Sequence, residues 1–155
     1  MITEVQVTGA ADIMRLLHEL PYEMVSKRGG PVKLALAKGA RIVRDQAKAN
    51  LQAAIALNGD QSTGLLLKNV ISSRGKPPIG SRGERYLVRV RRKAYPNRDD
   101  VSVRKTANLL EYGSSQQPAT PWLRPAVQSR GQEVIEVMTA DLLRRLELLV
   151  TRLAR

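Results

Sequence analysis

Apolar residues recur at intervals of three and four positions along two stretches of the chain, which is the spacing of one face of an α-helix. The first stretch begins at Pro31 and ends before Asn58-Gly59, residues that suit a helix start and a helix end. The second begins at Pro125. This spacing predicts helices at 31–57 and 125–154. Their apolar positions are Val32, Leu36, Ala40, Val43, Ala47, Leu51 and Ile55 in the first, and Val127, Val134, Ile135, Met138, Leu142, Leu146, Leu149 and Leu153 in the second.

Shorter segments fill the rest of the chain. Helical spacing predicts short helices at 13–20 and 65–71, and a third that Thr106 caps and that ends at Tyr112. Alternation predicts a strand at 4–8 and another at 85–92, where Tyr86, Val88 and Val90 share one face. Residues 101–104 are a plausible returning strand, so we expect a basic hairpin at 85–105. Glycines and prolines predict a long flexible loop at 72–84.

Together these elements indicate an α+β fold within a single domain, residues 1–155. We expect a small antiparallel or mixed sheet packed against helices, with a long C-terminal helix and a long flexible loop. Small residues in the 31–57 helix, among them Ala35, Gly39 and Ala47, would allow close packing against the sheet or another helix. The C-terminal helix is longer than a domain of this size needs, so part of its apolar stripe is expected to face another subunit.

Composition narrows the class of protein. Hydrophobic residues make up 43% of the chain, which argues against a wholly disordered protein, and there is neither Phe nor Cys. Without Cys there can be no disulfide, thiolate metal site or Cys nucleophile. No apolar run is long enough to span a bilayer, and Met1–Glu4 lacks the pattern of a secretory signal. We therefore expect a product of the cytoplasm that has no membrane partner.

Positive charge is concentrated in one region. The formal net charge is +12, and residues 74–105 hold eleven basic and three acidic residues, a net of +8. Two interpretations stay open: these bases face DNA through sequence-independent phosphate contacts, or they form a solvated surface that meets an acidic protein. The candidates for facing a DNA channel are Arg85, Arg89, Arg91, Arg92, Lys93 and Arg98.

Two sequence blocks carry a resemblance to a known family. Asn108–Gly113 contains Glu-Tyr-Gly, and Pro118–Ala126 reads Pro-Ala-Thr-Pro-Trp-Leu-Arg-Pro-Ala. This pairing resembles the signature of the neck and tail-completion family of tailed bacteriophages, the head–tail joining proteins related to lambda's tail-completion protein. Thr63–Val70 and Lys38–Lys48 are similar to weaker elements of that family. The resemblance spans residues 5–127, whereas the leucine-rich last helix and the very basic hairpin are less typical of the family.

The resemblance implies a structural virion protein of the neck or tail end, made and assembled in the host cytoplasm. It implies a homo-oligomeric ring around the DNA channel, with a hexamer favoured and a dodecamer as the alternative. Its neighbours would be head-closure or connector proteins and tail-tube or tail-terminator proteins, with double-stranded DNA in the channel. It implies no catalytic activity and no cofactor.

Five residues are candidates for a subunit interface: Glu111, Trp122, Leu123, Arg124 and Pro125. Aromatic and arginine side chains are common interface anchors. Two alternatives stay open for this segment. Trp122 anchors a neighbouring subunit, or packs over the subunit's own sheet while Pro125 starts the last helix, or does both. Glu111 either pairs with Arg124, caps a backbone amide, or is a solvated acid at the end of a helix.

No residue pattern indicates an enzyme. His18 is the only histidine, and Asp99-Asp100 reads as a turn rather than a metal site. Gly80–Gly83 lacks the Lys-Ser/Thr ending of a phosphate-binding loop. We expect no catalytic, cofactor or metal site. The alternative function is a sequence-independent nucleic-acid-binding protein, although so few aromatic residues argue against a platform that stacks single-stranded bases.

Overall fold

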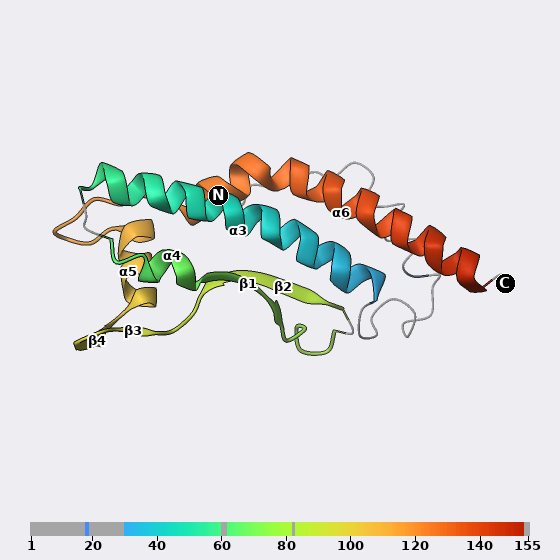
Figure 1. Cartoon of the computed structure of the whole chain (residues 1–155), viewed down its shortest axis with the longest axis horizontal. Helices are drawn as coiled ribbons and strands as arrows, with labels where there is room; N and C mark the ends of the chain where they lie inside the picture. Colours follow the sequence, from blue (N-terminus) through green and yellow to red (C-terminus); the bar gives the residue numbers. More distant parts are fainter. Residues whose placement is uncertain (1–17, 19–29, 60–61, 82, 154–155) are drawn as a thin grey trace. The chain divides into compact units, whose positions relative to one another are not determined.

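A computed structural model describes residues 18, 30–59, 62–81 and 83–153 of the chain (Figure 1). The chain divides into two compact units, each built from separate segments. The first unit comprises Met1–Gly39, Arg74–Tyr86 and Gln132–Arg155, and the second comprises Ala40–Ser73 and Leu87–Gly131. The prediction that residues 1–155 form one domain stays a prediction, and the strand expected at 4–8 and the helix expected at 13–20 lie outside the described residues, save His18.

In the described part of the chain, two helices come first, four short strands follow, and two further helices come last; the labels are those of Figure 1. In chain order they are α3 (Pro31–Leu57), α4 (Leu65–Asn69), β1 (Val70–Gly75), β2 (Arg85–Val90), β3 (Ala94–Tyr95), β4 (Arg98–Ser102), α5 (Val103–Tyr112) and α6 (Leu123–Leu153). The fold is α+β, with two antiparallel two-stranded sheets packed against helices and a long C-terminal helix that contacts α3. The predicted fold class is confirmed.

The strand pairing differs from the predicted hairpin at 85–105. Strand β2 pairs with β1, and β3 pairs separately with β4, with Tyr95 opposite Arg98 across a tight turn. The predicted 72–84 loop was also wrong at its start, because β1 continues to Gly75. The cause is the apolar run 65–71, whose first part is helical and whose last part is extended. Such short runs fit either structure until β-branched residues, here Val70 and Ile71, decide for the strand.

The second unit has an aliphatic core closed by the chain's only tryptophan. Helices α4 and α5 pack against each other, and α5 follows β4 directly. Small residues at the helix contacts let the larger side chains fill the space between elements. The buried core residues are Ala47, Leu51, Leu66, Val70, Val103, Ala107, Leu110, Trp122 and Ala126.

In the first unit, α3 and α6 lie side by side (Figure 1). Ala35, Leu142 and Leu146 are buried between them, with Val32 packed alongside. At Gly39 the helices come so close that an added Cβ would stand 2.6 Å from the Cγ of Met138. The predicted close packing of the first long helix is therefore confirmed at this residue.

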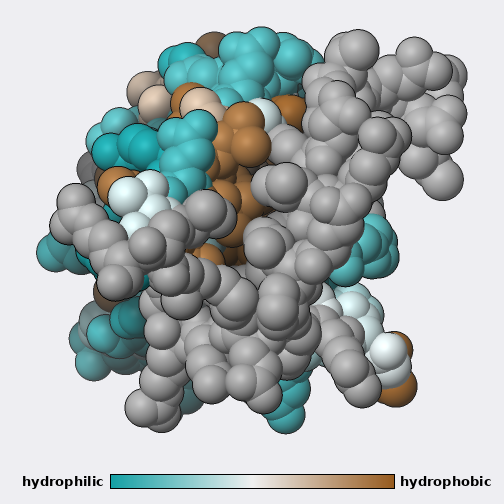
Figure 2. Space-filling view, turned by 90° about the vertical axis from the view of Figure 1, so that its right-hand side faces the viewer, coloured by the Kyte–Doolittle hydropathy of each residue, from teal (hydrophilic) through white to brown (hydrophobic). Residues whose placement is uncertain are grey.

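The described residues on the face drawn in Figure 2 are mostly hydrophilic, and a strip of hydrophobic residues lies near its centre. No helix within the described ranges is long and apolar enough to cross a membrane. Exposed apolar side chains on the two long helices of the first unit include Leu34, Leu143 and Leu148.

Candidate functional site

A buried carboxylate joins the end of α5 to the start of α6. Glu111 is 5% exposed, and one of its oxygens, Oε2, accepts hydrogen bonds from the backbone amides of Trp122 at 2.8 Å and Leu123 at 2.9 Å. The other, Oε1, accepts from the Arg124 amide at 3.2 Å and from its Nε at 3.1 Å. The first amides of a helix have no partner within the helix. A side chain on a different helix therefore supplies the cap of α6.

Pro125, which follows Arg124 in the first turn of α6, needs no hydrogen-bond acceptor. Pro125 has no N–H, so its place in the first turn of α6 leaves no donor unsatisfied. The helix begins at Leu123 rather than at Pro125 as predicted. Of the alternatives for Glu111, the structure has two at once, because the carboxylate caps backbone amides and also pairs with Arg124.

The chain reverses after α5 at a position that requires glycine. Gly113 has φ 75° and ψ −177°, a region almost restricted to glycine, and its amide donates to the Leu109 carbonyl at 2.8 Å. An added Cβ would stand 2.7 Å from the backbone nitrogen of Ala119. Further along, the Thr120 amide donates to the Leu110 carbonyl at 2.8 Å. This reversal brings the start of α6 back to Glu111.

Trp122 lies in the core of the second unit and is 2% exposed. Its Nε1 donates to the Ala107 carbonyl at 3.2 Å, so the buried indole has no unsatisfied donor. The Trp122 carbonyl accepts a hydrogen bond from the side-chain Nδ2 of Asn50 at 3.0 Å, and the Asn50 Oδ1 accepts one from the side-chain Nε2 of Gln46. Trp122 therefore packs within its own subunit, which was one of the two alternatives considered for it.

The electrostatics keep Glu111 ionised. Burial by itself would raise the pKa of Glu111, but the hydrogen bonds from three backbone amides and the Arg124 guanidinium outweigh it, so the pKa lies below its usual value. The positive end of the α6 dipole favours the same charged form. The carboxylate thus holds its negative charge where the helix begins.

The exposed side of this junction carries an aromatic–cation pair. The guanidinium carbon of Arg124 lies 5.1 Å from the centre of the Tyr112 ring, and both side chains are exposed. Leu123 and Pro125 are half-buried beside them. Of the five predicted interface residues, Glu111 and Trp122 are thus buried within the subunit and Arg124 reaches solvent. Their role at a subunit interface stays a prediction.

All six basic residues proposed to face DNA are exposed, and none pairs with a carboxylate in the described part of the chain. Beneath them, Val88 and Val90 of β2 pack against the core. Backbone hydrogen bonds hold the region in place, from the Arg91 amide to the Asn69 carbonyl at 2.9 Å and from the Val103 amide to the Lys93 carbonyl at 2.8 Å. The six are Arg85, in the first unit, and Arg89, Arg91, Arg92, Lys93 and Arg98, in the second.

A buried aspartate in the first unit was not expected from the sequence. Asp141 accepts a hydrogen bond from the Lys38 Nζ at 3.0 Å and is paired with Arg145, while Arg144 lies 3.7 Å away. The hydrogen bond from Arg145 lowers the pKa of Asp141 most, although burial opposes it. This network joins α3 to α6. Only the acid's position next to apolar Leu142 could have signalled its burial.

The residues considered for metal binding do not belong to a cluster of metal-binding side chains in the described part of the chain. His18 is helical and exposed. Asp99 and Asp100 are exposed in β4, so the turn predicted for them was wrong, because the reversal takes place at residues 96–97. In the ranges that the structure describes, no three His, Asp or Glu side chains gather in a way that could hold a metal ion.

Comparisons with family models, curated proteins and solved structures returned no match to this chain.

Proposed function

We propose that this chain is a structural virion protein of a long-tailed bacteriophage, with no enzymatic activity. It forms a homo-oligomeric ring, preferably a hexamer, at the neck or tail end, where it completes the tail and joins it to the head around the DNA channel. Its neighbours are head-closure or connector proteins on one side and tail-tube or tail-terminator proteins on the other.

The observation that carries this proposal is the coincidence between the resembling motif and one structural junction. Glu111 accepts the amides that open α6, Gly113 has a backbone conformation almost restricted to glycine, and Trp122 fills the core. Pro125 fits the first turn because it has no amide to satisfy. Glu111, Gly113, Trp122 and Pro125 of the motif therefore each have a physical task in one junction, and this supports its being a family signature rather than a chance match.

Exposed side chains beside the junction support an assembly role. Tyr112 and Arg124 stack on each other in solvent, and such pairs are frequent anchors at protein interfaces. A carboxylate-capped turn holds them in fixed positions, which lowers the entropy cost of binding a neighbour.

The exposed bases support proximity to DNA in the channel. Six cations without carboxylate partners in the described chain attract a polyanion, and contacts to phosphate do not depend on sequence. Loose contacts of this type suit a channel through which DNA must move, because no base edge is bound.

The test is made on virions of the phage that encodes the chain. Mass spectrometry of purified particles should detect it, and electron microscopy should locate a ring of it between head and tail. Deleting the gene should leave DNA-filled heads and separate tails. Infectious particles that assemble without the chain would refute the proposal.

The alternative is a sequence-independent nucleic-acid-binding protein, which the same exposed bases favour. In that case the isolated chain should bind a DNA duplex tightly, with an affinity that falls steeply as salt rises. Replacing Arg89, Arg91 and Arg92 by Gln together should then abolish the protein's function without altering its presence in any particle.

A further inference from the structure

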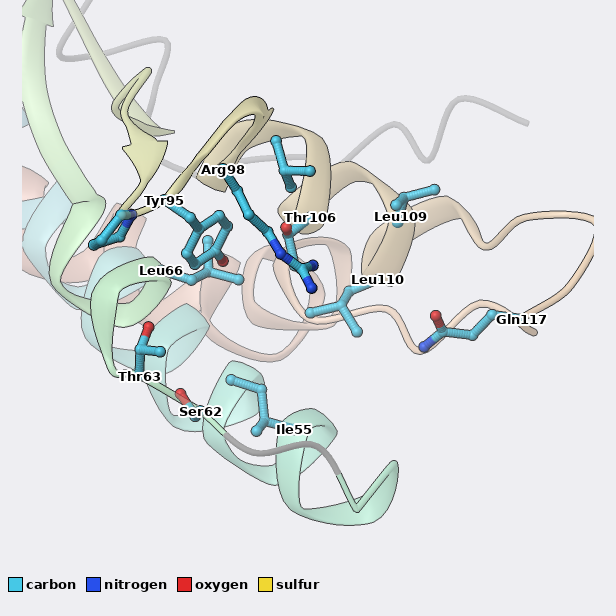
Figure 3. A pocket seen from close by; sticks show the side chains of 12 residues that line it. Ile55, Ser62, Thr63, Leu66, Tyr95, Arg98, Thr106, Leu109, Leu110 and Gln117 are labelled. Atoms are coloured by element: carbon cyan, nitrogen blue, oxygen red, sulfur yellow. The ribbon is translucent and has the colours of Figure 1, made fainter.

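A groove opens in the second unit between the end of α3, the segment before α4, the β3–β4 turn and α5 (Figure 3). Its volume is about 530 Å³, within the range of sites that bind ligands or side chains. The walls are mainly apolar, formed by Ile55, Leu66, Val101, Leu109 and Leu110. The groove therefore has room for one or two aliphatic side chains of a partner.

One cation reaches into this apolar groove. Figure 3 shows the side chain of Arg98 extending into it, with Tyr95 on one side and Leu110 on the other. Arg98 is exposed, and no carboxylate of the described residues forms an ion pair with it. A guanidinium carries five N–H donors in a fork that matches a carboxylate. The groove therefore presents a guanidinium to which a carboxylate of another molecule can bind.

The combination of an apolar wall and a free guanidinium defines the chemistry of the occupant. A carboxylate would bind Arg98 while a neighbouring aliphatic side chain covers the leucines. Nucleic acid could meet the guanidinium through a phosphate, but it offers no aliphatic side chain for the wall. Arg104 and Lys105 do not line this groove, and the exposed Asp99 and Asp100 follow Arg98 in the chain, so the preference for a carboxylate rests on Arg98 alone.

The loop around Ile79 of a second copy fits the groove poorly. The most exposed aliphatic residue of the described chain is Ile79, which has the size to enter the groove. Its nearest charged neighbours in the sequence, Lys76 and Arg82, are both basic. A loop from another copy would therefore bring positive charge to Arg98.

We propose that this groove binds an extended segment of a partner protein in which acidic and aliphatic residues alternate. The aliphatic side chains cover Leu109 and Leu110, and a carboxylate of the segment pairs with Arg98. This inference does not depend on the proposed role in a phage neck, because it concerns the isolated subunit and a peptide.

The test measures fluorescence anisotropy of short labelled peptides mixed with the full chain. A peptide that alternates leucine and glutamate should bind, whereas a leucine–lysine peptide and a serine–glutamate peptide should not. Arg98→Gln should weaken binding about tenfold or more, since charge-assisted hydrogen bonds are lost. Arg92→Gln removes the same charge outside the groove and should change binding less than about twofold.

A second pair of variants tests the apolar wall. Leu109 and Leu143 are 39% and 41% exposed, and only Leu109 lines the groove. Leu109→Lys should abolish peptide binding, and Leu143→Lys should leave it unchanged. Circular dichroism must show that all four variants are folded.

Several results would overturn the inference. If the leucine–lysine peptide bound as tightly as the leucine–glutamate peptide, the groove would not require a negative charge. If the serine–glutamate peptide did so, the groove would not require apolar side chains. Equal losses in Arg98→Gln and Arg92→Gln would mean a diffuse electrostatic attraction. If duplex DNA displaced the peptide and lost its own affinity in Arg98→Gln, the groove would be a nucleic-acid site. If Ile79→Asp abolished a self-association that blocks the peptide, the occupant would be a second copy.

Discussion

Replacing Glu111 tests whether the carboxylate acts mainly on backbone amides or on Arg124. Glu111→Ala leaves three amides and the guanidinium without their acceptor, and it should lower the free energy of unfolding by about 4 kcal/mol. Glu111→Gln keeps one accepting oxygen, which the buried Trp122 and Leu123 amides will use. The Arg124 donors then face the NH₂ group of the new glutamine but can reach water, so the free energy of unfolding should fall by about 2 kcal/mol.

Arg124→Ala separates the two contributions. The Arg124 side chain is 61% exposed, so solvent screens its ion pair with Glu111 and the loss should stay below about 1 kcal/mol. Urea unfolding followed by circular dichroism gives the three values, provided that the denaturant slope is unchanged. A loss in Arg124→Ala as large as that in Glu111→Gln would refute the claim that amide capping dominates.

Three further perturbations probe the same fold. Gly113→Ala should cost about 3 kcal/mol, because alanine tolerates neither the backbone angles nor the nearby backbone. Trp122→Ala should cost about 4 kcal/mol in chemical unfolding, since it empties a buried site. Glu111 and Asp141 both have lowered pKa values, so they stabilise the folded chain above the pKa values of the unfolded chain, near 4. That stabilisation is lost as the pH falls through the lower pKa values that the two carboxyl groups have in the folded chain. Measuring the free energy of unfolding at a series of acidic pH values should show this loss.

Matched variants serve as controls for these changes. Gly59 also has positive φ, but no atom of the described residues lies near its missing Cβ, so Gly59→Ala should cost less than Gly113→Ala. Tyr112 is exposed, and Tyr112→Ala should change stability by only about 0.5 kcal/mol. The double variant Glu111→Gln, Asp141→Asn should lose the steep part of the acid transition, and an unchanged slope would contradict the assigned pKa directions.

Local sequence signals predicted the helices well where proline and glycine mark the ends. Helix α3 runs over the predicted 31–57, and α6 extends to Leu153, the last residue that the structure describes. The cap of α5 was wrong: Ser102, and not Thr106, accepts the amide of Lys105. The hydroxyl of Ser102 or of Thr106 could cap a helix in this sequence. Because β4 ends at Ser102 and α5 begins directly after it, Ser102 is the cap.

The contacts of the site depend on residues far apart in the chain, and this limits what a sequence can predict. Glu111 and Arg124 could be paired on paper because both belong to one short motif. Asp141 and Lys38 are separated by 103 positions, and no periodic pattern connects them. The start of α6 at Leu123 was missed for the same reason, since its cap comes from the preceding helix.

The capping of α6 by α5 also has a consequence for how the long helix opens. Helix ends ordinarily exchange their amide hydrogens fast because they fray independently of the rest of the protein. Here the amides of Trp122, Leu123 and Arg124 donate to a buried side chain on another helix. They should exchange only when α5 separates from α6. The N-terminal turn is thus expected to be among the slowest-exchanging parts of α6.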